Sequence, residues 1–170
     1  MVHSTTPGAP TTAFTKVELK LTADQQIEYV MANVQGLSRE QTEFLLKAVH
    51  KRDGSVVFGG SRVRGAARVD PEGKVISDLD VGFEGLTRGQ INGIMNDFNK
   101  KFGGSTKTKI IEHNWIYPGS TPRGIPEIVS PEEFFLRSGA RADGPKSGQP
   151  FGPSGYIKVK PDGGVEAGRL

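Results

Sequence analysis

The chain has 170 residues, no cysteine and a net charge of +3, with 35% hydrophobic and 24% charged residues. This length suits one domain with one substantial core, and the lack of cysteine excludes disulfide bonds and thiolate metal sites. No apolar run approaches the ~18 residues of a membrane-spanning helix, so we expect no membrane partner. The small positive excess is compatible with nucleotide or RNA partners.

The first residues are small, polar and rich in proline and threonine, so residues 1–20 are expected to be a flexible lead-in. The pattern changes at Thr22. Thr22 and Gln25 have the spacing of a capping box, and apolar residues follow at helical intervals. The sequence therefore predicts an amphipathic helix that ends at Gly36.

A second capping box, Ser38 with Gln41, predicts another helix. Asp53-Gly54 has the composition of a turn and is expected to end this helix. The short apolar segment 55–58 then predicts a strand in the middle of a sheet.

A glycine turn with nearby arginines follows this strand: Gly59-Gly60-Ser61, then Arg62 and Arg64. Glycine lets a backbone approach a ligand closely, and exposed N–H groups of such a turn favour anions. Arginine is suited to bidentate contact with phosphate. The turn therefore predicts phosphate contacts from Gly60 and Ser61, with charge added by Arg62 or Arg64.

The next predicted strand, 76–82, carries Asp78 and Asp80. Successive side chains of a strand alternate between its faces, so both carboxylates are expected on one face. Like charges held together need a compensating cation or a shared proton, and Mg²⁺ takes oxygen ligands together with phosphates. The preceding residues, 68–74, have the composition of a turn.

Two helices and one strand are predicted between residues 87 and 138. Thr87 opens a helix with a clear apolar stripe, which ends before Gly103. Residues 107–117 are rich in β-branched and aromatic residues and predict one strand. A proline-rich loop, 118–128, separates this strand from a helix that starts at Ser130.

Residues 139–170 are rich in glycine and proline, so they are expected to form a C-terminal segment outside the domain. Within that segment only 156–160 has the pattern of a strand, and we expect it at an edge of the sheet.

The Gly-Ser turn and the Asp-x-Asp strand together resemble the signature of the nucleotidyltransferase superfamily of DNA polymerase β type. The predicted order of elements from residue 39 to residue 138 agrees with the minimal core of that family. The resemblance implies an α+β fold over residues 21–138, with a nucleotidyltransferase-like mixed sheet of three or more strands flanked by helices. It also implies transfer of a nucleoside monophosphate from a nucleoside triphosphate to an acceptor hydroxyl, with Mg²⁺ or Mn²⁺ bound.

In this resemblance Asp78 and Asp80 are catalytic metal ligands, and a third carboxylate completes the site. Glu112 is the first candidate, because an unpaired charge in the middle of an apolar strand is costly. Glu84 is the second candidate.

The resemblance assigns the β- and γ-phosphates to Gly60 and Ser61, with Arg62 or Arg64 adding positive charge. Ser61 and Asp78 are separated by 16 residues, more than is common in the family. The extra length falls in the predicted turn.

The acceptor implied by the resemblance is a tRNA or a protein side chain, or a small molecule such as an antibiotic. Compact domains of this family also resemble bacterial toxins, either from toxin–antitoxin pairs or from secreted polymorphic toxins. That implies a cytoplasmic site of action, delivery within a secreted protein, and a cognate antitoxin or immunity protein as partner. Two alternatives stay open: a non-catalytic nucleotide- or protein-binding module of the same fold, and a phosphohydrolase or nuclease that uses the same carboxylates.

Overall fold

The computed structural model describes residues 15–102, 108–111, 115–117, 127–139 and 155–169. The strands, in chain order, are β1 (Thr15–Lys20), β2 (Ser55–Gly59), β3 (Leu79–Glu84), β4 (Thr108–Ile111), β5 (Trp115–Tyr117), β6 (Glu127–Val129), β7 (Gly155–Val159) and β8 (Gly164–Arg169). The helices are α1 (Ala23–Asn33), α2 (Arg39–His50), α3 (Ser61–Arg64), α4 (Arg88–Phe102) and α5 (Pro131–Gly139).

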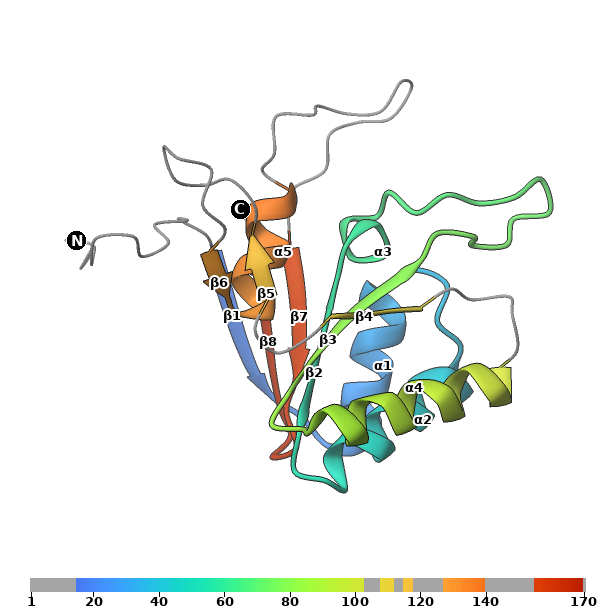
Figure 1. Ribbon diagram of the computed structural model, residues 1–170. Helices are drawn as coiled ribbons and strands as arrows, with labels where there is room; N and C mark the ends of the chain where they lie inside the picture. The colour runs from blue at the N-terminus through green and yellow to red at the C-terminus, as the bar shows by residue number, and fades with distance from the viewer. Residues whose placement is uncertain (1–14, 103–107, 112–114, 118–126, 140–154, 170) are drawn as a thin grey trace.

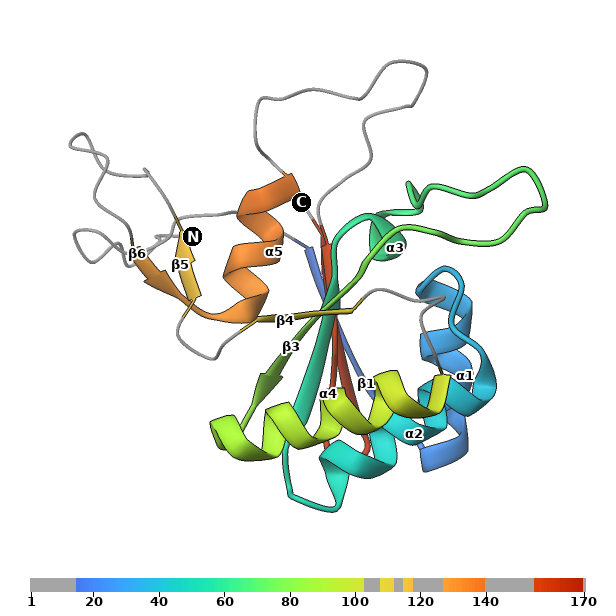
Figure 2. The same ribbon diagram turned by 45° about the vertical axis from the view of Figure 1, so that its right-hand side comes forward.

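Six strands form one sheet in the order β1-β8-β7-β2-β3-β4, and β5 pairs with β6 in a separate two-stranded sheet. In this order each pair of neighbouring strands is antiparallel, except that β3 and β4 are parallel. Helices α1, α2 and α4 lie on one side of the large sheet and α5 lies on the other (Figures 1 and 2). The prediction of an α+β fold with a mixed sheet between helices is confirmed.

The helix starts follow the predicted capping residues. Thr22 Oγ1 accepts from the backbone N–H of Gln25 at 3.2 Å, and the Gln25 side chain accepts from the Thr22 N–H at 3.0 Å. The same reciprocal pair occurs at Ser38 before α2 and at Thr87 before α4. These bonds satisfy N–H groups that the first turn of a helix leaves without partners.

The sheet has a different core on each face because side chains alternate along β2. Val56 and Phe58 belong to the larger core, beneath α1, α2 and α4. Val57 points the other way and packs with Phe135 and Leu136 of α5. All three β2 side chains are fully buried, as expected for a central strand.

The chain ends contribute more to the sheet than the sequence predicted. Residues 15–20, assigned to the lead-in, form β1, which pairs with β8 over its whole length. The strand predicted at 156–160 was expected at an edge, but β7 lies between β8 and β2. The large sheet therefore takes strands from both sides of residues 21–138, the range expected for the domain. Pairing with β8 brings both β1 and β7 into the sheet, and such pairing between distant segments outweighs what the local sequence indicates.

The strand predicted over 107–117 is also corrected. Its first part, β4, joins the large sheet, and its last part, β5, pairs with β6. β6 itself overlaps the end of the segment predicted as a loop, 118–128. Across the described ranges, no helix has the length and apolar character required to cross a membrane.

Candidate active site

The predicted phosphate turn connects β2 to α3. Gly60 has φ 77° and ψ −161°, a conformation that side chains disfavour. The carbonyl oxygen of Gly60 accepts from the N–H groups of Val63 and Arg64, both at 3.1 Å. Gly65, with φ 76°, ends this short helix. The turn is thus a compact, folded unit at the end of a buried strand.

Asp80 lies against this turn. The antiparallel register of β2 and β3 pairs Gly59 with Asp80. A Cβ atom added at Gly60 would overlap the carboxylate of Asp80, so glycine is required here by space as well as by φ. The structure therefore brings together two residues that the sequence predicted to share a site, Gly60 and Asp80.

Asp78 was predicted within the same strand as Asp80, but it precedes the first residue of β3, Leu79. Both aspartates are half-buried and close enough to Arg62 to interact with its charge. Burial lowers the pKa of the Arg62 guanidinium, while the carboxylates of Asp78 and Asp80 act in the opposite direction. The two aspartates and Arg62 therefore form one electrostatic group.

Arg62 has a different place from the one predicted. Its side chain is 1% exposed. Nε and Nη2 donate to the carbonyl oxygen of Ser77 at 3.0 and 2.7 Å, and Nη1 donates to the carbonyl oxygen of Gln35 at 3.2 Å. Arg62 thus fixes the residue next to Asp78 and directs its donors to the protein backbone. We therefore assign Arg62 a positioning role. Arg64, which is half-buried, is the remaining candidate for a contact with phosphate.

The same contacts anchor the long segment between α3 and β3. Gln35 donates its N–H to the carbonyl oxygen of Arg62, and its Oε1 accepts from the N–H of Ala67 at 3.0 Å. At the other end, the hydroxyl of Ser77 accepts from the N–H of Arg68 at 2.6 Å. The two ends of segment 66–77 are therefore held together by hydrogen bonds to Gln35, Arg62 and Ser77, next to the site.

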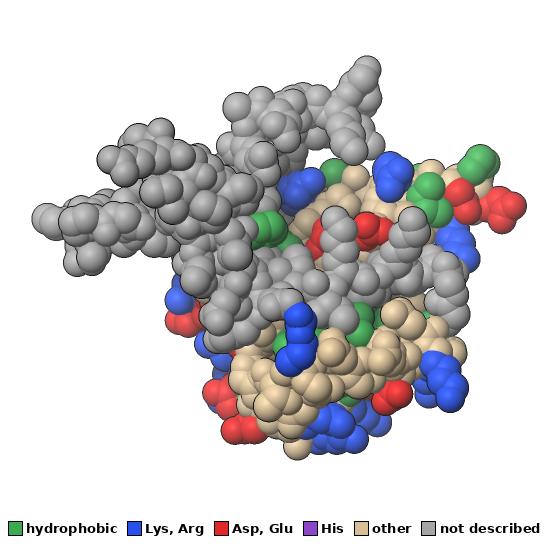
Figure 3. Space-filling model, in the orientation of Figure 1, with side chains coloured by type: hydrophobic (Ala, Val, Ile, Leu, Met, Phe, Trp, Pro, Cys, Tyr) green, Lys and Arg blue, Asp and Glu red, His purple; other side chains and the backbone are tan. Residues whose placement is uncertain are grey.

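Beyond this base the segment 66–77 forms a ribbon that projects from the body of the protein (Figure 1). Val69 and Val75 form an antiparallel bridge, and Asp70 Oδ1 accepts from the N–H groups of Glu72 and Lys74 at 2.9 and 2.8 Å. Basic, acidic and hydrophobic side chains are mixed on the projecting part (Figure 3). The extra residues between Ser61 and Asp78 are therefore folded outward without separating the turn from the aspartates.

The two candidates for the third carboxylate have different outcomes. Glu84 is excluded: it lies at the opposite end of β3 from Asp80, and its carboxylate pairs with Lys158. Glu84 follows Asp80 by four residues, and four residues along a strand correspond to roughly 13 Å. Glu112 lies outside the described residues. The parallel register of β4 pairs Lys109 with Asp80, a position that the sequence analysis did not consider and that only the sheet order identifies.

The described residues fit a magnesium or manganese ion at two points. Asp78 and Asp80 supply carboxylate oxygens, and both act on the charge of the Arg62 guanidinium. Mg²⁺ is usually held by one or two carboxylates together with substrate phosphates. No group of three or more His, Cys, Asp or Glu side chains suited to a metal occurs in the described part of the chain. Among the described residues, Asp78 and Asp80 are therefore the carboxylates to consider for such an ion.

Comparisons of the chain with protein families, with curated proteins and with solved structures found no match. We therefore infer the function from the residues and from their arrangement.

Proposed function

We propose that the protein is a metal-dependent nucleotidyltransferase that transfers a nucleoside monophosphate from a nucleoside triphosphate to an acceptor hydroxyl. The observation that carries this proposal is the contact between Gly60 and the Asp80 carboxylate. It joins a glycine turn suited to phosphate with a carboxylate suited to a divalent cation. The resemblance to the nucleotidyltransferase superfamily supports the same reading.

The residues have separate roles in this proposal. The N–H groups at Gly60 and the Ser61 hydroxyl bind the β- and γ-phosphates, and Arg64 adds positive charge. Asp78 and Asp80 would hold Mg²⁺ or Mn²⁺. When bound, the ion supplies neutralisation of phosphate charge at the reacting centre.

The reaction forms one bond and breaks one bond. The acceptor oxygen attacks the α-phosphorus, the bond from that phosphorus to the β-phosphate oxygen breaks, and pyrophosphate leaves. The acceptor proton passes to a carboxylate, for which Glu112 stays the predicted residue. Orienting the triphosphate and the acceptor is the main contribution that the protein makes in such a transfer.

The acceptor that we propose is a tRNA or a protein, and the proposed role is that of a bacterial toxin acting in the cytoplasm. Delivery within a secreted protein, and inhibition by an antitoxin or immunity protein, belong to the same proposal. The support for this part is the family resemblance of the Gly-Ser turn and the Asp-x-Asp segment.

The test is incubation of the protein with each α-labelled nucleoside triphosphate, Mg²⁺ and a bacterial lysate, followed by separation of protein and tRNA. We expect label to enter one of these fractions and pyrophosphate to be released. Asp78→Asn and Asp80→Asn should each reduce transfer at least about a hundredfold, in line with the loss of a metal ligand. Asp97→Asn, at an exposed position of α4, is the matched control and should keep full activity.

Undiminished transfer by the double variant of Asp78 and Asp80 would refute this mechanism. Metal-dependent nucleotide binding without any transfer would identify a binding module. Release of inorganic phosphate or cleavage of nucleic acid, without pyrophosphate, would identify the hydrolytic alternative.

A further inference from the structure

Helix α5 is packed directly against the strand that leads into the glycine turn. A Cβ atom added at Gly59 would overlap the ring of Phe135, so the ring lies on the backbone of the residue before the turn. Leu136 is buried beside it, against Val57 and Tyr156. The position of α5 is therefore coupled by contact to the position of Gly59 and of the turn that follows.

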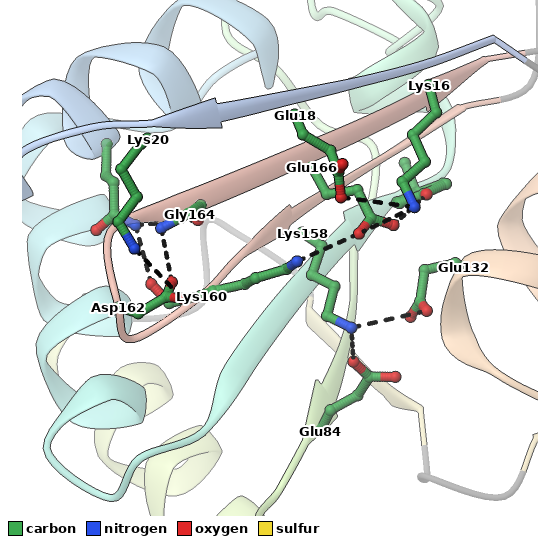
Figure 4. A network of polar contacts seen from close by, with 12 residues as sticks. Lys16, Glu18, Lys20, Glu84, Glu132, Lys158, Lys160, Asp162, Gly164 and Glu166 are labelled. Atoms are coloured by element: carbon green, nitrogen blue, oxygen red, sulfur yellow. Dashed lines mark hydrogen bonds and ion pairs between the residues drawn. The ribbon is translucent and has the colours of Figure 1, made fainter.

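The first turn of α5 buries a carboxylate in a charged cluster. Lys158 of β7 forms ion pairs with Glu84 of β3 and with Glu132 of α5, the latter at 3.8 Å between Nζ and Oε2 (Figure 4). The three side chains are only 18%, 19% and 19% exposed. Ionised carboxylates removed from water are costly unless they are fully paired.

This cluster holds two carboxyl groups and one ammonium group. Oε1 of Glu132 is buried and has no hydrogen-bond partner among the described residues. The carboxyl groups of Glu132 and Glu84 lie against the same ammonium group, and the charge of each opposes ionisation of the other. One proton on Glu132 would turn these two acceptors into a donor and an acceptor, and would balance the charge of Lys158.

Other charged side chains on the α5 side of the sheet are directed toward Glu166 and not toward Glu132. Tyr156 donates its hydroxyl proton to Glu166 of β8 at 2.5 Å. Glu166 also pairs with Lys16 of β1 and Lys160 of the β7–β8 connection, at 3.7 and 3.4 Å. Figure 4 shows that these lysines point toward Glu166, whereas Lys158 points toward Glu84 and Glu132. Glu18 of β1 lies near Glu166 (Figure 4); it is exposed and pairs with Lys16.

We propose that α5 is a pH-dependent support of the Gly59–Ser61 turn, docked on the sheet while Glu84 and Glu132 share one proton and loosened when both are ionised. The proposal concerns the fold around the turn and does not depend on the transfer reaction. Its experiments accordingly measure structure and not activity.

The direction of the pH effect follows from the burial of Glu132. Burial raises its pKa to about 7, the negative charge of Glu84 adds to this increase, and Lys158 opposes it. A raised pKa in the docked state means that docking is strongest below the pKa of a solvated glutamate, about 4.3, and weakens as the pH rises toward 7. Between about pH 5 and pH 8 the equilibrium for opening of α5 should increase roughly a hundredfold.

The experiment is amide hydrogen exchange of the full chain between pH 5 and pH 8, resolved by residue and corrected for the intrinsic pH dependence of exchange. We expect protection factors in α5 and at Gly59, Gly60 and Ser61 to fall together by this factor as the pH rises. In Glu132→Gln, which cannot ionise, the protection should be independent of pH. Glu40→Gln, at an exposed position of α2, is the control and should behave like the unaltered protein.

Protection in α5 that does not change with pH in the unaltered protein, or an unchanged pH effect in Glu132→Gln, would overturn the proposal. A titration of the glutamate side-chain carbons of the unaltered protein gives a second answer without any variant. One carboxyl group should titrate near neutral pH. Titration of every described glutamate below about pH 5.5 would refute the proposal.

Discussion

Arg62 donates two hydrogen bonds, from Nε and Nη2, to one acceptor, the carbonyl oxygen of Ser77. This fork joins α3 to the residue that precedes Asp78. A third bond, to the carbonyl oxygen of Gln35, extends the contact to the end of α1. The guanidinium thus links the glycine turn to the segment that carries the aspartate.

Arg62→Lys should lower the free energy of unfolding by about 2 to 3 kcal/mol, because lysine keeps the charge but loses the planar fork and leaves buried carbonyl groups unpaired. Chemical denaturation at neutral pH measures this loss. Arg68→Lys, at an exposed side chain, is the matched control and should change stability by less than about 0.5 kcal/mol. Equal stability of the two variants would contradict the role that we assign to Arg62.

Gly60→Ala should be more destabilising than Gly65→Ala, although both glycines have nearly the same φ, 77° and 76°. A methyl group at Gly60 would overlap the Asp80 carboxylate, whereas Gly65 has open space around it. Gly65 has ψ 19° and lies in the left-handed helical region, where alanine costs about 1 kcal/mol, whereas Gly60 has ψ −161° and lies in a region that essentially only glycine adopts. Gly60→Ala should therefore lose a further 1 to 3 kcal/mol or so, from this backbone strain together with the overlap. Thermal unfolding of both variants provides the comparison, and equal losses would contradict a close contact between Gly60 and Asp80.

Removal of divalent cations with a chelator should leave the melting temperature unchanged while it abolishes nucleotide binding. Asp78 and Asp80 are half-buried, so water and the nearby Arg62 stabilise their charges in the folded protein without an ion. Thermal unfolding with and without chelator measures the first effect, and titration with a nucleoside triphosphate measures the second. A large drop in melting temperature on chelation would indicate a structural metal ion instead.

Tyr156→Phe should destabilise the protein by about 1.5 to 3 kcal/mol at neutral pH, since the hydroxyl donates to a buried carboxylate, Glu166. Burial raises the pKa of Glu166, but the Tyr156 hydroxyl, Lys16 and Lys160 outweigh it, and the net pKa is lower than usual. A lowered pKa contributes stability above the usual glutamate pKa, about 4.3, and this contribution is lost as the pH falls further.

The loss in Tyr156→Phe should therefore become smaller in acid. Denaturation at several pH values between about 3 and 7 tests this expectation. Tyr29→Phe is the control at a half-buried tyrosine of α1. A loss that stays constant down to the lowest pH would show that the hydroxyl acts independently of Glu166.

Local signals in the sequence were sufficient for the helices and for the central strands. The capping pairs at Thr22 and Ser38 predict α1 and α2, because the two side chains that make the bonds are only three residues apart. The apolar run at β2 and the adjacent glycine turn predicted the neighbourhood of Gly60 and Asp80. These features depend on contacts within short stretches of chain.

Other features depend on pairings that no single stretch encodes. The alternation Lys-Val-Glu-Leu-Lys in β1 is a strand pattern, but it follows a polar segment, and among the described strands its partner is the distant β8. The role of Arg62 depends on Gln35 and Ser77, which the fold brings together from distant positions. For the same reason, the sequence offered Glu84 as a metal ligand, although the sheet places Lys158 beside it.

The place of β7 in the sheet also bears on how the protein folds as it is synthesised. Val56 pairs with Val159, so β2 obtains one of its two neighbours only after a segment about a hundred residues further along the chain has been synthesised. Such pairings between distant segments slow folding, since loop closure precedes the stabilising contacts. A ribosome-bound chain that lacks residues 155–169 would leave one edge of β2 open. The strand that leads into the glycine turn would then lack one of its neighbours, and the proposed activity would begin only after β7 has been released.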